Sequence, residues 1–177
     1  GDRMFGAQSP YVAGDLTPHF SILADYAHNP LVLRTVNTRE NKGAIVESQL
    51  FLHFNASLAI KDRILVNLEL PVALLQSGES PTGGGFSYTS PDSAEVSDLR
   101  AGLRVRLFGD YWDPFQIALG GYVWFPTGRS ENGSFVGEGS VRGLPQLILG
   151  GRVAERMVWS FDAGPDIRSS QTFGGPN

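Results

Sequence analysis

Apolar and polar residues alternate along most of this chain with a period of two. Between Leu99 and Leu107 every odd-numbered position is apolar, whereas three of the four even-numbered positions are arginine. A period of two places these two sets of side chains on opposite faces of an extended strand. No segment of similar length has the stripe of an amphipathic helix. The pattern therefore predicts strands, most clearly over residues 49–60, 64–74, 99–107, 115–125 and 159–168.

The connections between these segments alternate between short and long. Such an alternation is typical of an up-and-down antiparallel sheet, with short turns at one end and long loops at the other. Outer-membrane barrels have this asymmetry between their two ends. The sequence thus predicts an all-β, antiparallel up-and-down transmembrane β-barrel, or part of one. The short turns fall at 61–62, 109–114 and 154–156, and the polar stretches rich in glycine, serine or proline fall at 76–95, at 126–142 and from 169 onward.

The choice between a soluble and a membrane barrel depends on which face of the strands is apolar. A soluble barrel of the lipocalin kind has an apolar interior, whereas a membrane barrel has an apolar outside and a polar lumen. Here the face that carries Arg100, Arg104 and Arg106 also carries small residues such as Gly102 and Ala118. The apolar faces are unbroken for long enough to match the roughly 9–11 residues of a transmembrane strand. This favours the membrane barrel, with a soluble ligand-binding barrel as the alternative.

Four stretches of the chain carry a resemblance to a known family. They are residues 25–33, Asn67–Gly78, Ser97–Gly102 and Phe125–Gly128, in this order. The chain from about Thr17 onward resembles the N-terminal barrel region of OmpA-family outer-membrane proteins, in the form typical of myxobacteria. The resemblance implies a location in the outer membrane of a Gram-negative bacterium. In longer relatives it also implies a calcium-repeat or peptidoglycan-binding domain, which these residues do not include, so peptidoglycan binding is not carried over.

The strand count bears on how the barrel is completed. We expect an N-terminal extension over residues 1–16 and a barrel domain over 17–177. If residues 17–36 form one long strand bent at Pro30, there are about seven strands. Single-chain bacterial barrels have an even number, so we expect the barrel to be incomplete at its C-terminus, or completed by other chains. If that first strand is split, the count is about eight, which closes a small barrel.

Composition and charge exclude several classes of function. The 177 residues are 41% hydrophobic and 18% charged, with a net charge of −4, which gives no support for binding nucleic acid. There is no cysteine, so disulfides, thiolate metal sites and cysteine nucleophiles are excluded. No Gly-x-Ser-x-Gly motif accompanies His53 and Asn55. We therefore expect no enzyme activity, no cofactor and no metal.

The polar face of the predicted strands supplies the candidate functional residues. In a narrow barrel these side chains pair across the interior and fill it, because an unpaired charge away from water is costly. In a wider barrel they line water, and the arginines favour anions. The sequence predicts a structural membrane anchor or a passive channel, with outer-membrane lipid as its surroundings. The candidate lumen-facing residues are Arg100, Arg104, Arg106, Arg152, Arg168, Glu69, Asp162, Asp166, Asp25, His53, Asn55 and Gln116.

Aromatic residues near the predicted strand ends suggest one further feature. Trp112, Trp124, Trp159 and Tyr26 fit a belt at the membrane interface, and they fit ordinary packing equally well.

Overall fold

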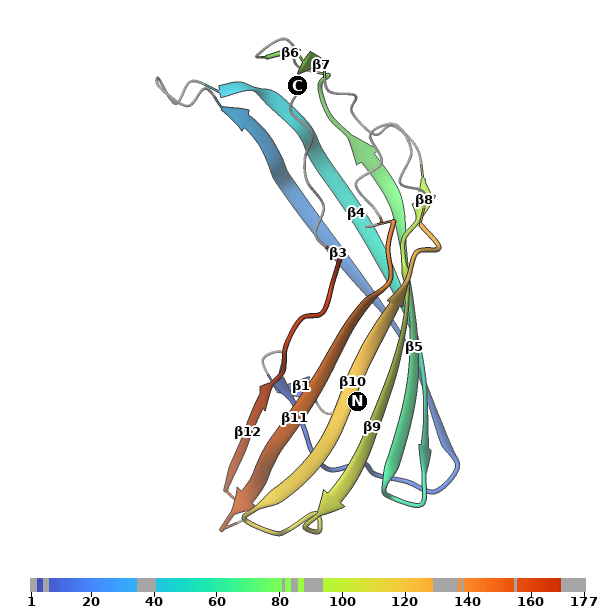
Figure 1. The fold of residues 1–177 in the computed structure, drawn as a ribbon, viewed down its shortest axis with the longest axis vertical. Helices are drawn as coiled ribbons and strands as arrows, with labels where there is room; N and C mark the ends of the chain where they lie inside the picture. The colour runs from blue at the N-terminus through green and yellow to red at the C-terminus, as the bar shows by residue number, and fades with distance from the viewer. Residues whose placement is uncertain are drawn as a thin grey trace.

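The fold of the computed structural model consists of strands and their connections (Figure 1). The structure describes residues 3–4, 7–34, 41–80, 82–83, 86–87, 94–128, 137, 139–154 and 156–169. Seven strands form the main sheet: β3 (Thr17–Arg34), β4 (Asn41–Ile60), β5 (Ile64–Ser77), β9 (Leu99–Phe108), β10 (Gln116–Phe125), β11 (Arg142–Val153) and β12 (Met157–Ala163). Five strands of two residues accompany them: β1 (Arg3–Met4), β2 (Ala7–Gln8), β6 (Thr82–Gly83), β7 (Phe86–Ser87) and β8 (Glu95–Val96).

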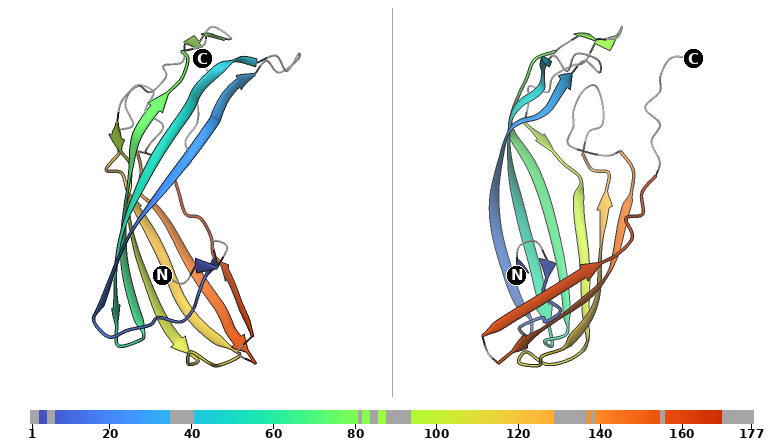
Figure 2. Two further views of the ribbon diagram at one scale, coloured as in Figure 1. Left: turned by 180° about the vertical axis from the view of Figure 1, so that it is seen from behind. Right: turned by 90° about the vertical axis from the view of Figure 1, so that its left-hand side faces the viewer.

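The main sheet is antiparallel and follows the order of the chain. Its strands run β12-β11-β10-β9-β5-β4-β3, and β8 adds a short pairing to β5. The sheet curls into a half-barrel (Figure 2), in which β3 and β12 are the two edges and do not pair with each other over the described residues. The all-β class, the antiparallel order and the count of seven long strands predicted from the sequence are confirmed. Within the described residues, no helix is long and apolar enough to cross a membrane.

Two local features of the first hairpins follow directly from their residues. Lys61 and Asp62 both have positive φ, at 50° and 52°, and the Arg63 amide donates to the Ile60 carbonyl. This is the type I′ geometry that matches the twist of two antiparallel strands. The predicted bend near Pro30 is also present, because Asn29 has a φ of 52° and the β3–β4 register shifts between His28 and Leu31.

Strand β12 is shorter than the sequence predicts. Alternation continues to Arg168, but the ladder between β11 and β12 ends at the pair Leu147–Ala163. Continuing that register would set Pro145 opposite Pro165, and neither proline has an amide to donate. Beyond this point the described chain pairs with β11 again at a bridge between Ile167 and Gly143.

The half-barrel has one apolar and one polar face. On its outer side, which we call the convex face, Leu103 and Leu119 are 51% and 50% exposed. On the inner side, the concave face, Arg104 is only 6% exposed although it directly follows Leu103. The convex face is continuous across the sheet, because paired residues on adjacent strands present the same kind of side chain. Its exposed large apolar residues include Phe20, Ile22, Phe54, Leu58, Val66, Leu68, Leu103, Leu119, Val123, Leu147 and Phe161.

Candidate functional site: the polar concave face

A row of directly paired residues crosses the middle of the concave face. Glu69 on β5 pairs with Arg100 on β9, Arg100 with Trp124 on β10, and Trp124 with Arg142 on β11. His53 on β4 joins this row through its side chain. We call these five residues the polar belt.

Glu69 is the centre of the ionic part of the belt. Its Oε1 lies 2.9 Å from His53 Nδ1, and its Oε2 accepts a hydrogen bond from Arg100 Nη2. The Glu69 side chain is only 10% exposed, and that of Arg100 is 17% exposed. Asn55 lies next along the same face of β4, and its Nδ2 donates to the His53 carbonyl at 3.2 Å. Both carboxylate oxygens of Glu69 thus have partners, as a buried carboxylate requires.

Arginine–aromatic stacking continues the belt toward β11. The Arg100 guanidinium carbon lies 4.7 Å from the Tyr122 ring centroid, and that of Arg142 lies 3.9 Å from the Trp124 centroid. Such a cation over an aromatic face is attracted by the ring quadrupole. Arg142 Nε also lies 3.9 Å from Asp166. Trp124 therefore lies on the concave face and packs against arginine side chains, while the interfacial aromatic belt stays a prediction.

The short-turn end of the concave face is occupied by the N-terminal segment. Residues 7–15, which we call the strap, cross from β12 to the β4–β5 turn (Figures 1 and 2). Gln8 Nε2 donates to Gln146 Oε1 at 2.8 Å, and the Ser160 hydroxyl donates to the Gln8 carbonyl. Arg104 Nη1 donates to the Ser9 carbonyl at 2.6 Å. Backbone carbonyls of the strap thus accept hydrogen bonds from β9 and β12, and the Gln8 side chain donates one to β11.

Aromatic and apolar contacts seat the middle of the strap. Tyr11 packs edge-on against Tyr111 at 4.9 Å between centroids, and the Arg106 guanidinium lies 5.1 Å from the Tyr11 centroid. Val12 is 1% exposed and Pro10 is buried. Because these side chains are shielded from water, the strap contributes apolar burial as well as hydrogen bonds.

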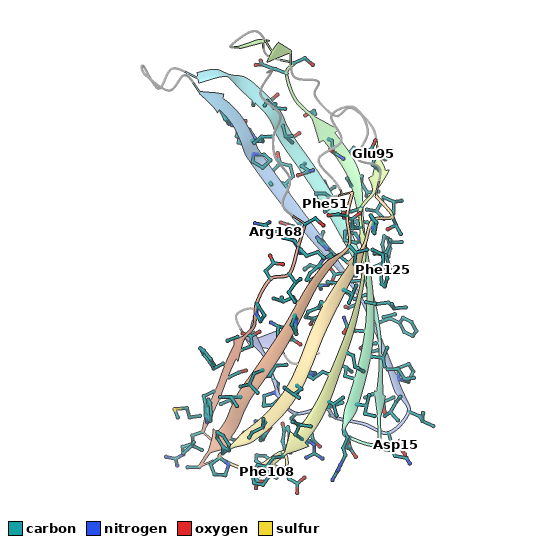
Figure 3. All side chains as sticks on the ribbon, in the orientation of Figure 1. Asp15, Phe51, Glu95, Phe108, Phe125 and Arg168 are labelled. Atoms are coloured by element: carbon teal, nitrogen blue, oxygen red, sulfur yellow. The ribbon has the colours of Figure 1, made fainter. Side chains whose placement is uncertain are left out.

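The far end of the strap is bound to the β4–β5 turn. The Gly14 amide donates to Asp62 Oδ1 at 2.6 Å, and the Lys61 amide donates to Asp15 Oδ1 at 3.0 Å. The Asp62 amide donates in turn to the Gly14 carbonyl. Figure 3 labels Asp15 at this short-turn end of the molecule. The strap is therefore attached at both of its ends.

The predicted candidate residues divide into three groups in the structure. Arg168 was expected on the last strand, but it lies exposed beyond β12, where the two facing prolines have ended the ladder (Figure 3). Asp25 shares the concave face of β3 with Ser21 but is exposed, and Asp166 lies in the segment after β12. The belt region contains His53, Asn55, Glu69 and Arg100, and the short-turn half of the concave face contains Arg104, Arg106, Gln116, Arg152 and Asp162.

Concave residues of the short-turn half also make contacts that do not involve the strap. Gln116 Nε2 donates to the Asp110 carbonyl at 2.7 Å, and Arg106 Nη1 donates to Asp110 Oδ1 at 2.7 Å. The Arg152 guanidinium lies 3.9 Å from the Tyr111 centroid. Asp162 accepts from Gln146 Nε2 at 3.2 Å. The contacts of Gln116, Arg106 and Arg152 link strands to the 109–114 turn, and that of Asp162 links β12 to β11.

Several residues of the site were missed in the sequence. The strap residues Gln8, Ser9 and Tyr11 show no alternation, so the pattern gave no sign that they line the site. Gln146 and Ser160 lie on strands and alternate with Leu147 and Phe161, and this alternation was a signal that could have found them.

Two of the stretches that carry the family resemblance meet at the long-loop end of the sheet. The Leu99 amide donates to Thr127 Oγ1 at 2.8 Å, and this hydroxyl donates to the Ser97 carbonyl. The Gly128 amide donates to Asp98 Oδ1 at 3.0 Å, and Asp98 is 6% exposed. The residues 97–99 and 127–128 therefore form a clasp that ties the start of β9 to the end of β10.

The chemistry available on the concave face is that of charge pairing and hydrogen bonding. Among the described residues, no group of three or more His, Cys, Asp or Glu side chains is placed to hold a metal ion. Comparisons of the chain with protein-family models, with curated proteins and with solved structures found no match.

Proposed function

We propose that this chain forms part of the wall of an outer-membrane β-barrel, with its convex face in lipid, and that it acts as a structural membrane anchor or a passive channel. One observation carries the proposal. Large apolar side chains are exposed across all seven long strands, while Glu69 of β5 and Arg104 of β9 are buried on the concave face. In water, exposed apolar patches larger than a few hundred Å² are rare on a monomer. In a bilayer the same arrangement is the expected one.

Strand length supports this proposal. β9 and β10 each contain ten residues, within the roughly 9–11 that a tilted transmembrane strand needs. All backbone groups of a strand in hydrocarbon must be paired with its neighbours. β9 and β10 have such neighbours on both sides. The OmpA-type resemblance remains part of the same proposal and rests on the four sequence stretches alone.

A soluble ligand-binding barrel is less well supported. Such a barrel would need an apolar interior for a hydrophobic ligand. The concave face instead presents Glu69, Arg100, Arg104 and Gln116, and most of its polar groups contact one another or the strap.

Site-directed fluorescence tests the lipid contact directly. Because the chain contains no cysteine, Leu103→Cys and Asn67→Cys each give one labelling position, on the convex and the concave face respectively. After folding into lipid vesicles, we expect a polarity-sensitive label at 103 to emit as in hydrocarbon and to be quenched by brominated lipid. The label at 67 is the matched control and should not be quenched by that lipid. Equal quenching at both positions, or a monodisperse protein in plain buffer, would refute the proposal.

A further inference from the structure

We propose that the strap, residues 7–15, is a releasable plug that closes the short-turn end of the polar trough formed by the concave face. This inference rests on the proposed function, because a plug matters only if the trough borders a water-filled lumen. It adds to that function a defined closing element within this chain.

The position of the strap is the first argument. It crosses the trough from β12, where β2 contacts that strand, to the β4–β5 turn (Figure 2). Along this path it contacts residues of β9, β11 and β12. A chain segment that lies across most of the sheet on its inner side obstructs any passage along that side.

The chemistry of its contacts is the second argument. The sheet binds the strap largely through the strap's backbone carbonyls. The Arg104 guanidinium donates to the Ser9 carbonyl, and the Ser160 hydroxyl donates to the Gln8 carbonyl. Side-chain donors that engage backbone carbonyls recognise an extended peptide in a defined place. The close approach at Gly150 agrees with this, since a Cβ there would lie 2.7 Å from Pro10 Cδ. The trough therefore contains a binding site that is specific for this segment.

The limited number of attachments is the third argument. In the residues described, the strap forms no long ladder with the sheet, and its buried apolar contacts centre on Pro10 and Val12. Segments with few ladder bonds open at a lower free energy than the strands around them. The strap can thus leave its seat while the seven strands remain paired.

Arg104 gives the plug a functional consequence. In the sequence this arginine is a candidate for attracting anions, but in the structure it is 6% exposed and donates to the strap. Release of the strap uncovers the guanidinium to the trough. The plugged state therefore blocks passage, and the released state presents a cationic lining that favours anions.

The first test measures release without a membrane. In the full chain, Ser160→Cys places a thiol at the seat of the strap, and Val12→Ser removes a buried apolar anchor. We expect the thiol in detergent to react about tenfold faster with a water-soluble reagent when Val12→Ser is also present, because the strap opens more often. Ala13→Ser is the matched control, since Ala13 is exposed on the same strap. Equal rates in the Val12→Ser and Ala13→Ser backgrounds would overturn the plug.

The second test measures passage in planar bilayers. Gln8→Cys and Gln146→Cys, whose native side chains touch, are joined by a short cleavable thiol linker in the Val12→Ser background. We expect almost no current from the linked protein, and a several-fold rise with anion preference after cleavage. If the protein inserts but the current is the same before and after cleavage, the plug is refuted and the membrane function stands. If the protein does not enter lipid at all, the proposed function fails and the plug fails with it, whatever the thiol rates show.

Discussion

The convex and concave faces of this sheet are built from the same strands, but the convex face exposes apolar side chains and the concave face buries polar ones. On β9, Leu103 is 51% exposed and its neighbour Arg104 is 6% exposed. In a protein surrounded by water, the free energy of transfer would favour the reverse arrangement. If the convex face lies in lipid, as proposed, the surroundings of the two faces, and not the composition of the strands, decide which residue type is buried.

The two faces also differ in how their side chains are held. Convex residues contact neighbours of the same kind across the strands, such as Phe54 beside Leu70 and Leu119 beside Leu147. Concave residues have specific partners, such as Glu69 with His53 and Arg100. Apolar packing tolerates many residues of similar size, whereas a buried charge tolerates few changes of its partner. Substitutions on the two faces should therefore destabilise the fold for different reasons.

The largest effect is expected for a charge placed on the convex face. Leu119→Arg puts a guanidinium into the body of β10, where we expect a loss of about 2–4 kcal/mol of folding free energy in lipid vesicles. Val141→Arg is the matched control, because Val141 is 56% exposed directly before β11, at the long-loop end. Near the interface the same charge costs about 0–1 kcal/mol. Equal losses in urea unfolding of the two variants would show that position 119 does not face hydrocarbon.

The alternation predicted from the sequence which side chains share a face, together with the number of strands and the bend at Pro30. These features depend on neighbours along the chain, since the side-chain period of a strand is a local property. The alternation of turn lengths likewise predicted the antiparallel order. What could be derived was the architecture and the face on which most candidate residues lie.

The end of β12 and the strap could not be predicted, because both depend on contacts distant in sequence. The facing of Pro145 and Pro165 becomes visible only once the β11–β12 register is known. The strap's hydrogen bonds to β9, β11 and β12 join residues 95 to 152 positions apart, and those to the β4–β5 turn join residues 46 and 48 positions apart. No period marks residues 7–15, so the sequence predicted an extension where the structure has a packed segment. The hydrogen bond of Arg104 to the Ser9 carbonyl was missed for the same reason.

A smaller loss is expected for the centre of the polar belt. Glu69→Gln keeps the size of the side chain but removes the charge that holds Arg100 and His53. We expect a loss of about 1.5–3 kcal/mol in unfolding free energy, the range for hydrogen bonds to charged groups. Glu79→Gln is the control, because Glu79 is exposed after β5, and should change stability by less than about 0.5 kcal/mol. If Glu69→Gln were equally neutral in chemical denaturation, the concave face would be as tolerant as the convex one.

The smallest effect is expected where the concave face is held by stacking. Arg142→Lys keeps the positive charge but loses the planar group that lies 3.9 Å from the Trp124 centroid, and a lysine ammonium does not reproduce that planar contact. We expect a loss of about 0.5–1 kcal/mol and a change in the near-ultraviolet circular dichroism of Trp124. Arg63→Lys, at the exposed β4–β5 turn, should leave both signals unchanged. An unchanged tryptophan signal in Arg142→Lys would mean that charge alone holds this part of the belt, and the concave face would then depend on ion pairing rather than on the shape of its arginines.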